Sequence, residues 1–539
     1  MNITFQCVNS MQRIFPSAPS IESESGAKAV KNTRHNVQLA LSSDKHLYDL
    51  RICVESEIKD YIKVYAQRLV PITSFPQSMD DYYESTAPTI VPDVVEKVDC
   101  FNLSPRAFRG FSVVFDLDKK VKSGEYKTTF TLKTSNNEVL ATTEYTLTVI
   151  DKVAKETDLV LTNWMHYDCI CQKHNVKPFS QKFYKVFAEY LKVFTECGYN
   201  MLLTPLFTPP LDTAIGGERL TAQLIKVEKT ENGYNFDFSA FEKFVKFAQK
   251  HGVKYFELSH LYTQWGGNAC PKIMATVNGK QERIFGWDVD SYDIRYRDFL
   301  TQFIPLLLQT LKKLGIDKAS YFHLTDEPND KHIEKYSELR SFTKSLIGDM
   351  PTMDAMSHYE FYEQGLVDVP VPEIDAFPSF KKNNVYPMFV YNCCNPSNGY
   401  YSNRFMAMPL HRTRIIGTQM FATEVQGYLH WGYNFYRSRL SISEIDPYFV
   451  TDAEYSYPSG DGFIVYPTED GATHSLRSLA GREAFDDYRI LSLAKEVLGK
   501  DKTDALIAEY GIENYDVYPR SAKAHFEFMQ KVISLIDEN

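Results

Sequence analysis

The chain has 539 residues, of which 44% are hydrophobic and 24% are charged, and it carries a formal net charge of −10. The length predicts about two to four domains, and the ordinary composition excludes disordered and fibrous classes of protein. The acidic balance argues against nucleic-acid binding, because a negative surface repels phosphate backbones.

Residues 1–155 are predicted to form an antiparallel β-sandwich. Short segments rich in β-branched and aromatic residues follow one another there, and no helical pattern lies between them. The predicted strands are residues 37–42, 46–54, 61–66, 111–117, 125–133 and 142–149.

Residues 156–490 are predicted to form a (β/α)8 barrel. Three times an apolar helical stripe ends at a glycine (Gly198, Gly252 and Gly315) and a buried apolar strand follows, which is typical of parallel strands with crossover helices. The strand candidates are residues 159–165, 201–206, 255–260, 321–325, 352–357, 374–377, 388–391 and 428–433. A doubly wound open sheet is the competing fold, but the chain has neither a Gly-x-Gly-x-x-Gly motif after a strand nor a Walker-A pattern. Residues 491–539 are predicted to form a helical extension packed on the barrel.

Polar and aromatic side chains gather at the C-terminal ends of the predicted strands, where barrel enzymes build their active sites. All four tryptophans lie at these ends or in the loops after them. Flat apolar rings beside carboxylates and amides suit a sugar, whose faces are apolar and whose rim carries hydroxyl groups. The candidate substrate-binding residues are Trp164, His166, Glu257, His260, Trp265, Asp354, Tyr391, Trp431, Tyr433 and Asn434.

Asp326 and Glu327 are the candidate catalytic residues, because they stand side by side where the predicted fourth strand ends. At ~5 Å and an effective dielectric of about 20, two such charges repel by roughly 3 kcal/mol, which raises one pKa by about 2 units. That shift keeps one acid protonated near neutral pH, as a general acid requires. The alternative is that Asp-Glu-Pro only ends the strand and caps the next helix, but one acidic residue suffices for capping.

Adjacent carboxylates do not easily flank a sugar ring from both sides, because their Cα atoms are only about 3.8 Å apart. Conventional glycosidases place their two carboxylates on opposite sides. Two neighbours can instead act on the same side, where one protonates the leaving oxygen and the other assists a nucleophile that the substrate supplies. A 2-acetamido group is such a nucleophile, since its carbonyl attacks the anomeric carbon and its N–H needs an anionic acceptor.

Several motifs resemble those of glycoside hydrolase family 123. They are the stretches at residues 163–168 and 204–213, the Thr-Asp-Glu-Pro strand end at 325–328, Tyr391-Asn-Cys-Cys, and residues 427–434. Residues 460–467, with the arginines and aspartates that follow them, are similar to the signature formerly labelled domain of unknown function 4091.

The resemblance implies a retaining exo-β-N-acetylgalactosaminidase that works by substrate-assisted catalysis through an oxazolinium intermediate, without a cofactor or metal. Glu327 would be the general acid/base, Asp326 would orient the acetamido group, and Tyr391 would hydrogen-bond the acetamido oxygen. Asn392 and His430 stand where the family pattern has threonine and an aromatic residue, and these departures bear on which sugar is accepted.

Three other functions stay open. A metal-dependent hydrolase could use the histidines near the strand ends, but its usual His-x-His and His-Glu-x-x-His patterns do not occur. A non-catalytic glycan-binding protein would have no reason to keep two repelling carboxylates. A conventional retaining β-glycosidase would use Glu257 or Asp354 as the nucleophile that faces Glu327.

We expect a cytoplasmic protein that acts on an imported oligosaccharide or another glycoconjugate. The longest apolar runs, such as residues 304–308, are much shorter than the ~18 residues of a membrane span. The N-terminal stretch has neither the basic nor the apolar region of a signal peptide. The nine cysteines include no Cys-x-x-Cys, and the Cys393–Cys394 pair is expected to be two buried thiols in a reducing compartment.

Overall fold

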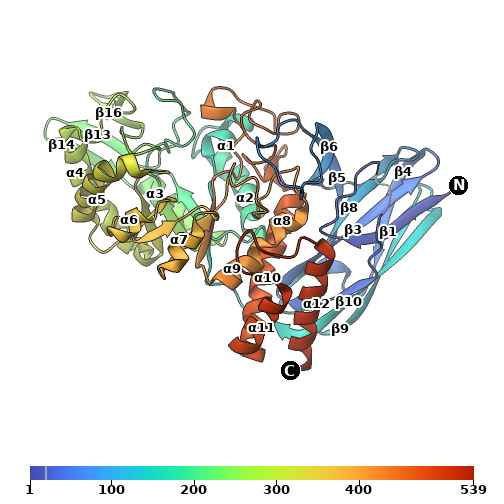
Figure 1. Cartoon of the computed structure of the whole chain (residues 1–539). Coiled ribbons are helices and arrows are strands. Elements are labelled where there is room, and N and C mark those ends of the chain that lie inside the picture. Colours follow the sequence, from blue (N-terminus) through green and yellow to red (C-terminus); the bar gives the residue numbers. More distant parts are fainter. Residues whose placement is uncertain (18–20) are drawn as a thin grey trace.

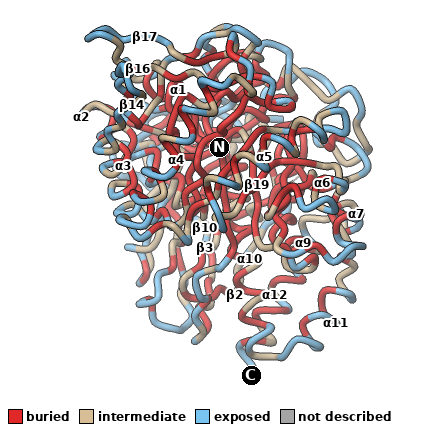
Figure 2. The backbone as a smooth tube through the Cα atoms, turned by 90° about the vertical axis from the view of Figure 1, so that its left-hand side faces the viewer, coloured by how far each residue is buried: buried red, intermediate tan, exposed pale blue. Residues whose placement is uncertain are grey.

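The computed structural model describes residues 1–17 and 21–539. β-Sheets built from the N-terminal part lie at one end of the molecule, a barrel lies at the other, and the C-terminal helices lie between and below them (Figure 1). Buried residues are concentrated in the middle of the molecule, and exposed residues lie mostly on the peripheral hairpins and loops (Figure 2).

The N-terminal part forms two five-stranded sheets. Their strands, in sheet order, are β1 (Ile3–Asn9), β3 (Thr33–Ser43), β8 (Arg109–Leu117), β5 (Ile62–Ile72) and β6 (Thr89–Glu96) in one sheet, and β2 (Gly26–Lys31), β10 (Val139–Val153), β9 (Gly124–Lys133), β4 (Leu47–Glu55) and β7 (Phe101–Leu103) in the other.

The antiparallel sheets predicted at the N-terminus are confirmed, with one exception: β2 pairs with β10 in parallel. All six predicted strands are present, and β1, β2, β6 and β7 are additional. Alternate residues of both sheets, such as Leu39 and Phe111 of one and Phe130 and Leu147 of the other, contribute to a single hydrophobic cluster. The face-to-face arrangement of a sandwich stays a prediction.

Eight parallel strands form a nearly closed barrel, as predicted. In chain order they are β11 (Val160–Asn163), β12 (Met201–Thr204), β15 (Tyr255–Leu258), β18 (Ser320–His323), β19 (Thr352–Ala355), β20 (Val369–Val371), β21 (Phe389–Tyr391) and β22 (Gly427–His430). Barrel strands that follow one another in the chain pair in parallel, except β20 and β21, and β22 pairs with β11. Between β20 and β21 only an isolated bridge joins Glu373 to Tyr391.

The predicted position of the sixth strand is wrong. The strand is Val369–Val371, and the predicted segment 374–377 lies after it and leads into helix α7 (Phe377–Lys382). The sequence around it reads Val-Pro-Val-Pro, and proline usually argues against a strand because it donates no hydrogen bond. Here Pro370 is tolerated because β20 has a continuous ladder with β19 alone.

Helices join the barrel strands, and the predicted stripes at 183–194, 241–248 and 300–311 lie in α2, α3 and α4. The helices of this part are α1 (Tyr167–Lys173), α2 (Gln181–Glu196), α3 (Ser239–Lys250), α4 (Ile294–Leu314), α5 (Ile333–Ile347), α6 (Glu360–Glu363), α7, α8 (Leu410–Arg414) and α9 (Ile416–Thr423). Among the described residues, no helix combines the length and apolar character needed to cross a membrane.

Two smaller sheets were not predicted. One is built from β13 (Lys226–Thr230), β14 (Gly233–Asp237), β16 (Ile273–Val277) and β17 (Lys280–Phe285), which lie in the long connections after β12 and β15. The other pairs β23 (Val465–Pro467) with β24 (Ala472–His474). Both consist of short antiparallel hairpins of three to six residues per strand, too short to show a clear alternating pattern.

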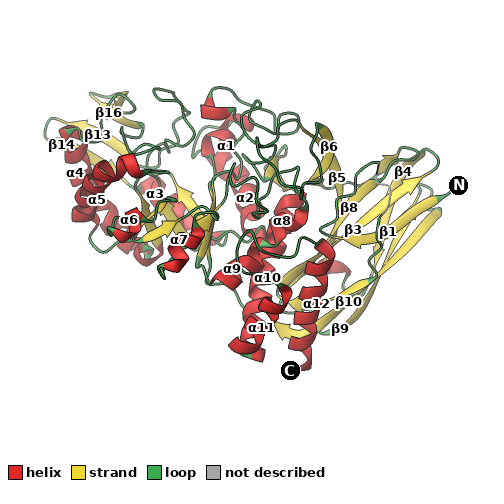
Figure 3. Ribbon diagram, in the orientation of Figure 1, coloured by secondary structure: helices red, strands yellow, loops and turns green. Residues whose placement is uncertain are grey.

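The C-terminal helices are α10 (Leu476–Leu498), α11 (Lys500–Tyr510) and α12 (Ala522–Glu538), so the helical part begins before the predicted residue 491. They do not pack on the barrel alone. α10 contacts α8 and α9 of the barrel part and also β3 and β6, and α12 contacts β2 and β10 (Figure 3). One cluster combines Val30 of β2, Ile490 of α10 and Val532 of α12. The helices therefore join the barrel to the N-terminal sheets.

A buried ion pair strengthens this junction. Arg477, on α10, donates to both oxygens of Asp93 on β6 at 3.0 and 2.9 Å, and neither side chain is accessible to solvent. The hydroxyl of Tyr466 also donates to Asp93 at 2.7 Å, whereas Arg13 is farther from it, at 4.0 Å.

Replacing Arg477 by methionine should lower the free energy of unfolding by about 3–5 kcal/mol, because it leaves the buried charge of Asp93 without its bidentate partner. Urea denaturation measures this change. The matched control is Lys127→Ala, which removes an exposed pair with Glu144 (2.8 Å) and should cost less than about 1 kcal/mol. Equal losses in the two variants would contradict a structural role for the buried pair.

Candidate active site

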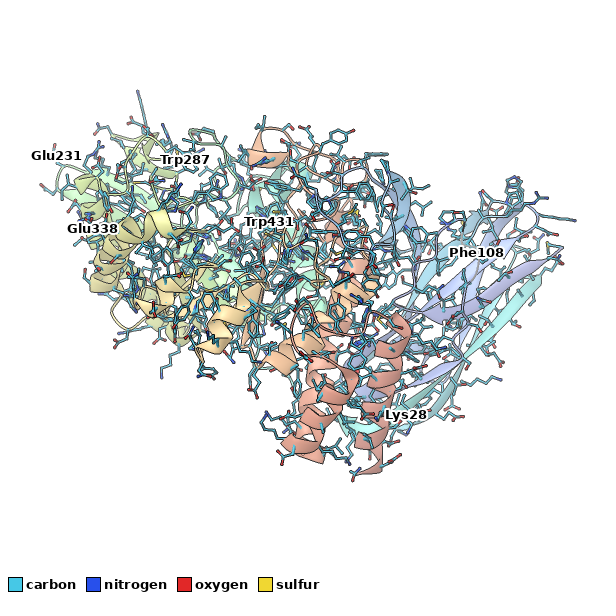
Figure 4. The ribbon with its side chains drawn as sticks, in the orientation of Figure 1. Lys28, Phe108, Glu231, Trp287, Glu338 and Trp431 are labelled. Carbon is cyan, nitrogen blue, oxygen red and sulfur yellow. The ribbon has the colours of Figure 1, made fainter. Side chains whose placement is uncertain are left out.

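A pocket opens at the C-terminal ends of the barrel strands. Its lining residues are Trp164, Leu211, Asp212, Gln264, Trp265, Asp326, Glu327, Ala355, Tyr391, Cys393, Cys394, Leu429, Trp431 and Tyr457. It therefore brings together both candidate catalytic residues and three of the four tryptophans. Trp431 lies in the middle of the molecule, whereas the fourth tryptophan, Trp287, lies apart from it near β16 (Figure 4).

The backbone after β18 holds the two carboxylates in place. The carbonyl of Asp326 accepts the backbone N–H of Trp265 at 2.8 Å, and the N–H of Glu327 donates to the carbonyl of Ala355 at 3.1 Å. Glu327 has a φ of 45°, a left-handed conformation that non-glycine residues rarely adopt. Such strain costs about 1–3 kcal/mol and is found most often at functional sites.

The surroundings of the pair raise the proton affinity of both acids. Asp326 is half-buried, and Glu327 reaches solvent through the pocket while protein surrounds it on the other sides. Burial, and next the charge of Glu327, raise the pKa of Asp326 well above its usual range. Burial also raises the pKa of Glu327. The pair therefore keeps a proton at a pH where isolated carboxyl groups have lost theirs, and the two groups titrate together.

Tyr391, at the end of β21, contacts the pair directly. Its hydroxyl donates a hydrogen bond to Glu327 Oε1 at 3.0 Å. This bond stabilises the carboxylate and opposes the rise in the pKa of Glu327. Tyr391 is thus placed to tune Glu327 and to contact a ligand beside it.

Two of the pocket tryptophans are fixed by buried carboxylates. Trp164 donates its indole N–H to Glu257 Oε1 at 2.8 Å, and Trp431 donates to Asp461 Oδ2 at 2.9 Å. Trp265 is more exposed, with 40% of its surface accessible to solvent. Three aromatic rings around one pocket suit the apolar faces of a sugar ring.

Glu257 and Asp354 lie beneath the pocket and do not line it, since neither is accessible to solvent. Besides Trp164, Glu257 accepts a hydrogen bond from Thr162 at 3.2 Å and faces His323 Nδ1 at 2.7 Å. Asp354 points out of the barrel and accepts two backbone N–H groups of residues 324–325 at 3.0 and 3.1 Å. Their oxygens are occupied by protein donors.

Four more of the predicted substrate-binding residues are buried behind the pocket tryptophans: His166, His260, Tyr433 and Asn434. The ring of His166 faces the carbonyl of Trp431 at 3.0 Å, and Asn434 exchanges two hydrogen bonds with the backbone of His166, at 2.8 and 3.1 Å. The hydroxyl of Tyr433 donates to a carbonyl of α2 at 2.9 Å. In this structure they support the pocket without lining it.

Sequence reasoning assigned no role to several residues that line the pocket. Asp212, in the connection after β12, accepts the hydroxyl of Tyr457 at 2.7 Å and the N–H of Leu440 at 3.1 Å. Gln264 lines the same region. Asp212 lies inside the motif at 204–213 and could have been found there, but the loops that carry Tyr457 and Gln264 show no pattern that predicts their position.

Two groups of described side chains come close enough to share a metal ion: His260, His323 and Asp326, and an exposed set at Asp330, His358 and Glu360 outside the pocket. Burial alone would lower the pKa of His323, but nearby carboxylates outweigh it and raise the pKa to about 10. A metal ligand must be a neutral imidazole. In the first set, protonated His323 would have to lose a proton before it could bind a metal ion.

The family model described as the catalytic domain of glycoside hydrolase 123 matches residues 164–494, more than half of the chain. The chain belongs to glycoside hydrolase family 123. It is therefore a glycosidase with a glycan substrate, and the matched range includes the pocket and both acidic residues.

A solved structure of a family 123 glycoside hydrolase from Clostridium perfringens, studied for glycolipid glycan hydrolysis, has the same fold. The identity is 14% and the TM-score is 0.77, over 100% of this chain and 99% of that one. A putative β-galactosidase from Bacteroides fragilis has 9% identity and a TM-score of 0.31, over 86% of this chain and 59% of that one, too low to support an argument. No curated protein matches.

Proposed function

We propose that this glycosidase removes terminal β-linked N-acetylgalactosamine, or a related 2-acetamido sugar, with retention of configuration. The substrate's own acetamido carbonyl attacks the anomeric carbon and forms an oxazolinium intermediate. Glu327 protonates the leaving oxygen and then activates water, while Asp326 accepts the acetamido N–H and stabilises the developing positive charge. The observation that carries this proposal is that two adjacent carboxylates of one strand end line one pocket.

Burial argues against a conventional retaining β-glycosidase that uses Glu257 or Asp354 as its nucleophile. A protein nucleophile must reach the anomeric carbon, but Glu257 and Asp354 lie outside the pocket and are inaccessible to solvent. Asp212 is the remaining carboxylate among the lining residues, and both of its oxygens already accept hydrogen bonds. We assign it to the recognition of sugar hydroxyl groups.

The two departures from the family pattern lie behind the pocket. Asn392 is buried, where it accepts the hydroxyl of Tyr428 at 2.7 Å and donates to a carbonyl at 3.0 Å. His430 is buried and accepts the N–H of Gly432 at 3.0 Å. Neither residue lines the cavity, which supports the galacto preference that the family resemblance implies. All nine cysteines are free thiols, which supports the proposed cytoplasmic location.

Aryl β-glycosides with and without a 2-acetamido group test the proposed function. We expect β-N-acetylhexosaminides to be cleaved, with the galacto form preferred, and the matching 2-hydroxy glycosides to be almost inert, because they bring no nucleophile. A thiazoline that mimics the oxazoline should inhibit strongly, since it resembles the state that the site stabilises.

The matched comparison is one aglycone on both sugars, so that only the 2-substituent differs. If plain β-galactosides or β-glucosides react as fast as their N-acetyl counterparts, substrate assistance is wrong. The protein would then supply the nucleophile, and Asp212→Asn would be the next variant to assay.

A further inference from the structure

A buried charge cluster lies beneath the pocket, and the proposed chemistry does not use it. His323 places Nδ1 2.7 Å from Glu257 Oε1 and Nε2 3.0 Å from Asp354 Oδ1, and all three side chains are inaccessible to solvent. Nδ1 is hydrogen-bonded to Glu257, whereas Nε2 lies close to Asp354 without a hydrogen bond. Two carboxylates at these distances stabilise the cationic form of the imidazole. Burial lowers the pKa of His323, but the two carboxylates outweigh it and raise the pKa to about 10, which favours the cation at neutral pH.

The cluster reaches the pocket at two points. A ring nitrogen of His323 and a carboxylate oxygen of Asp326 lie within 4.8 Å of each other. On the other side, the same Glu257 oxygen that faces His323 accepts the indole N–H of Trp164, which lines the pocket. One side chain thus lies close both to Asp326 and to the carboxylate that supports an aromatic wall.

We propose that His323 is a positioning residue, whose positive charge favours the ionised form of Asp326 and whose bond to Glu257 fixes Trp164 in the pocket wall. The inference rests on the proposed function, in which Asp326 acts as an anion while Glu327 carries the proton. In this proposal the cluster keeps Asp326 ionised and leaves the proton on Glu327.

The charges around Asp326 make this division necessary. Glu327 beside it, Glu257 from β15 and Asp354 from β19 all favour its neutral form, and His323 opposes them. The fifth group, His260, lies against the ring of His323, with centroids 3.9 Å apart and the ring planes tilted by 32°. Burial, and next the charge of His323, lower the pKa of His260 well below its usual range, so it stays neutral. Without His323, only groups that disfavour the anion would remain.

The pH dependence of kcat/KM in His323→Gln tests the proposal. At a separation below 5 Å and an effective dielectric of about 20, removing the cation should raise the pKa of Asp326 by roughly two units. The acidic limb should move to higher pH by a similar amount, and kcat/KM at the wild-type optimum should fall about 10–100-fold and partly recover at higher pH. A merely structural role would lower activity equally at every pH and leave the limb in place.

His260→Gln is the matched control. The ring of His260 is as buried as that of His323 and lies against it, but it is neutral, so its replacement removes no charge. Its acidic limb should stay at the wild-type position. A shifted limb in His260→Gln, or an unshifted one in His323→Gln, overturns the proposal.

A second measurement does not depend on activity or on a folded variant. In wild-type protein labelled with ¹⁵N-histidine, NMR should show an imidazolium with both nitrogens protonated at pH 8, and His323→Gln identifies it where that variant folds. Absence of any such imidazolium overturns the proposal even if the enzyme cleaves N-acetylhexosaminides. Conversely, a wild type that fails to cleave them refutes the proposed function, while the NMR result still decides the charge of His323.

Discussion

Glu327→Gln should lower the turnover of natural glycosides by about 10²–10⁴-fold while largely sparing substrates with very acidic leaving groups. Glutamine cannot donate a proton to the departing oxygen, and general acid assistance typically contributes a factor of this size. An acidic phenol leaves without that assistance. Glu327 lines the pocket beside Asp326 and accepts a hydrogen bond from Tyr391, so the substitution changes the reacting group with little change in shape.

Steady-state kinetics with a series of aryl glycosides whose phenols differ in acidity measures this effect. The variant should show a much steeper dependence on leaving-group acidity than the wild type. Wild-type rates on unactivated oligosaccharides would show that another residue supplies the proton.

Asp326→Asn should cost activity by a different route, with a loss on the order of 10²–10³-fold. A neutral amide cannot stabilise the positive charge that develops on the acetamido nitrogen. The loss should therefore persist with activated leaving groups, because they do not replace that charge. The same aryl series provides the measurement.

The two variants serve as controls for each other, since they lie at adjacent positions and each exchanges a carboxylate for its amide. Equal sensitivity to the leaving group in both would contradict the division into one acid and one electrostatic stabiliser. Circular dichroism and urea denaturation of both proteins separate these effects from unfolding.

The barrel could be predicted from the sequence because its strands are continuous apolar runs that follow helical stripes and glycines. The sixth strand was not predicted because it has only three residues and one of them is proline, which usually argues against a strand. The proline is tolerated because this strand has a continuous ladder on one side only. The small sheet of β13, β14, β16 and β17 was not predicted because its strands have only five or six residues each. Local pattern thus predicts elements long enough to show an apolar face, and it fails for very short strands and for a strand that contains proline.

The catalytic pair could be predicted because its residues are adjacent in sequence and follow a recognisable strand. The other polar residues at strand ends were harder to divide between the pocket and the interior. Glu257 and His323 face the barrel interior one layer below the pocket, and Asp354 faces outward, a distinction that depends on strand register and depth. Tyr457 and Gln264 come from long loops, and only the tertiary fold brings them to the sugar site.

The incomplete closure of the barrel has a consequence for the acid. β20 and β21 share no ladder, and an isolated bridge joins Glu373, two residues after β20, to Tyr391 of β21. Tyr391 therefore lies at the seam of the barrel, and it also donates the hydrogen bond that Glu327 accepts. A small sideways displacement of β21 lengthens that bond and increases the proton affinity of Glu327. The width of this seam and the acidity of the catalytic group are thus mechanically linked.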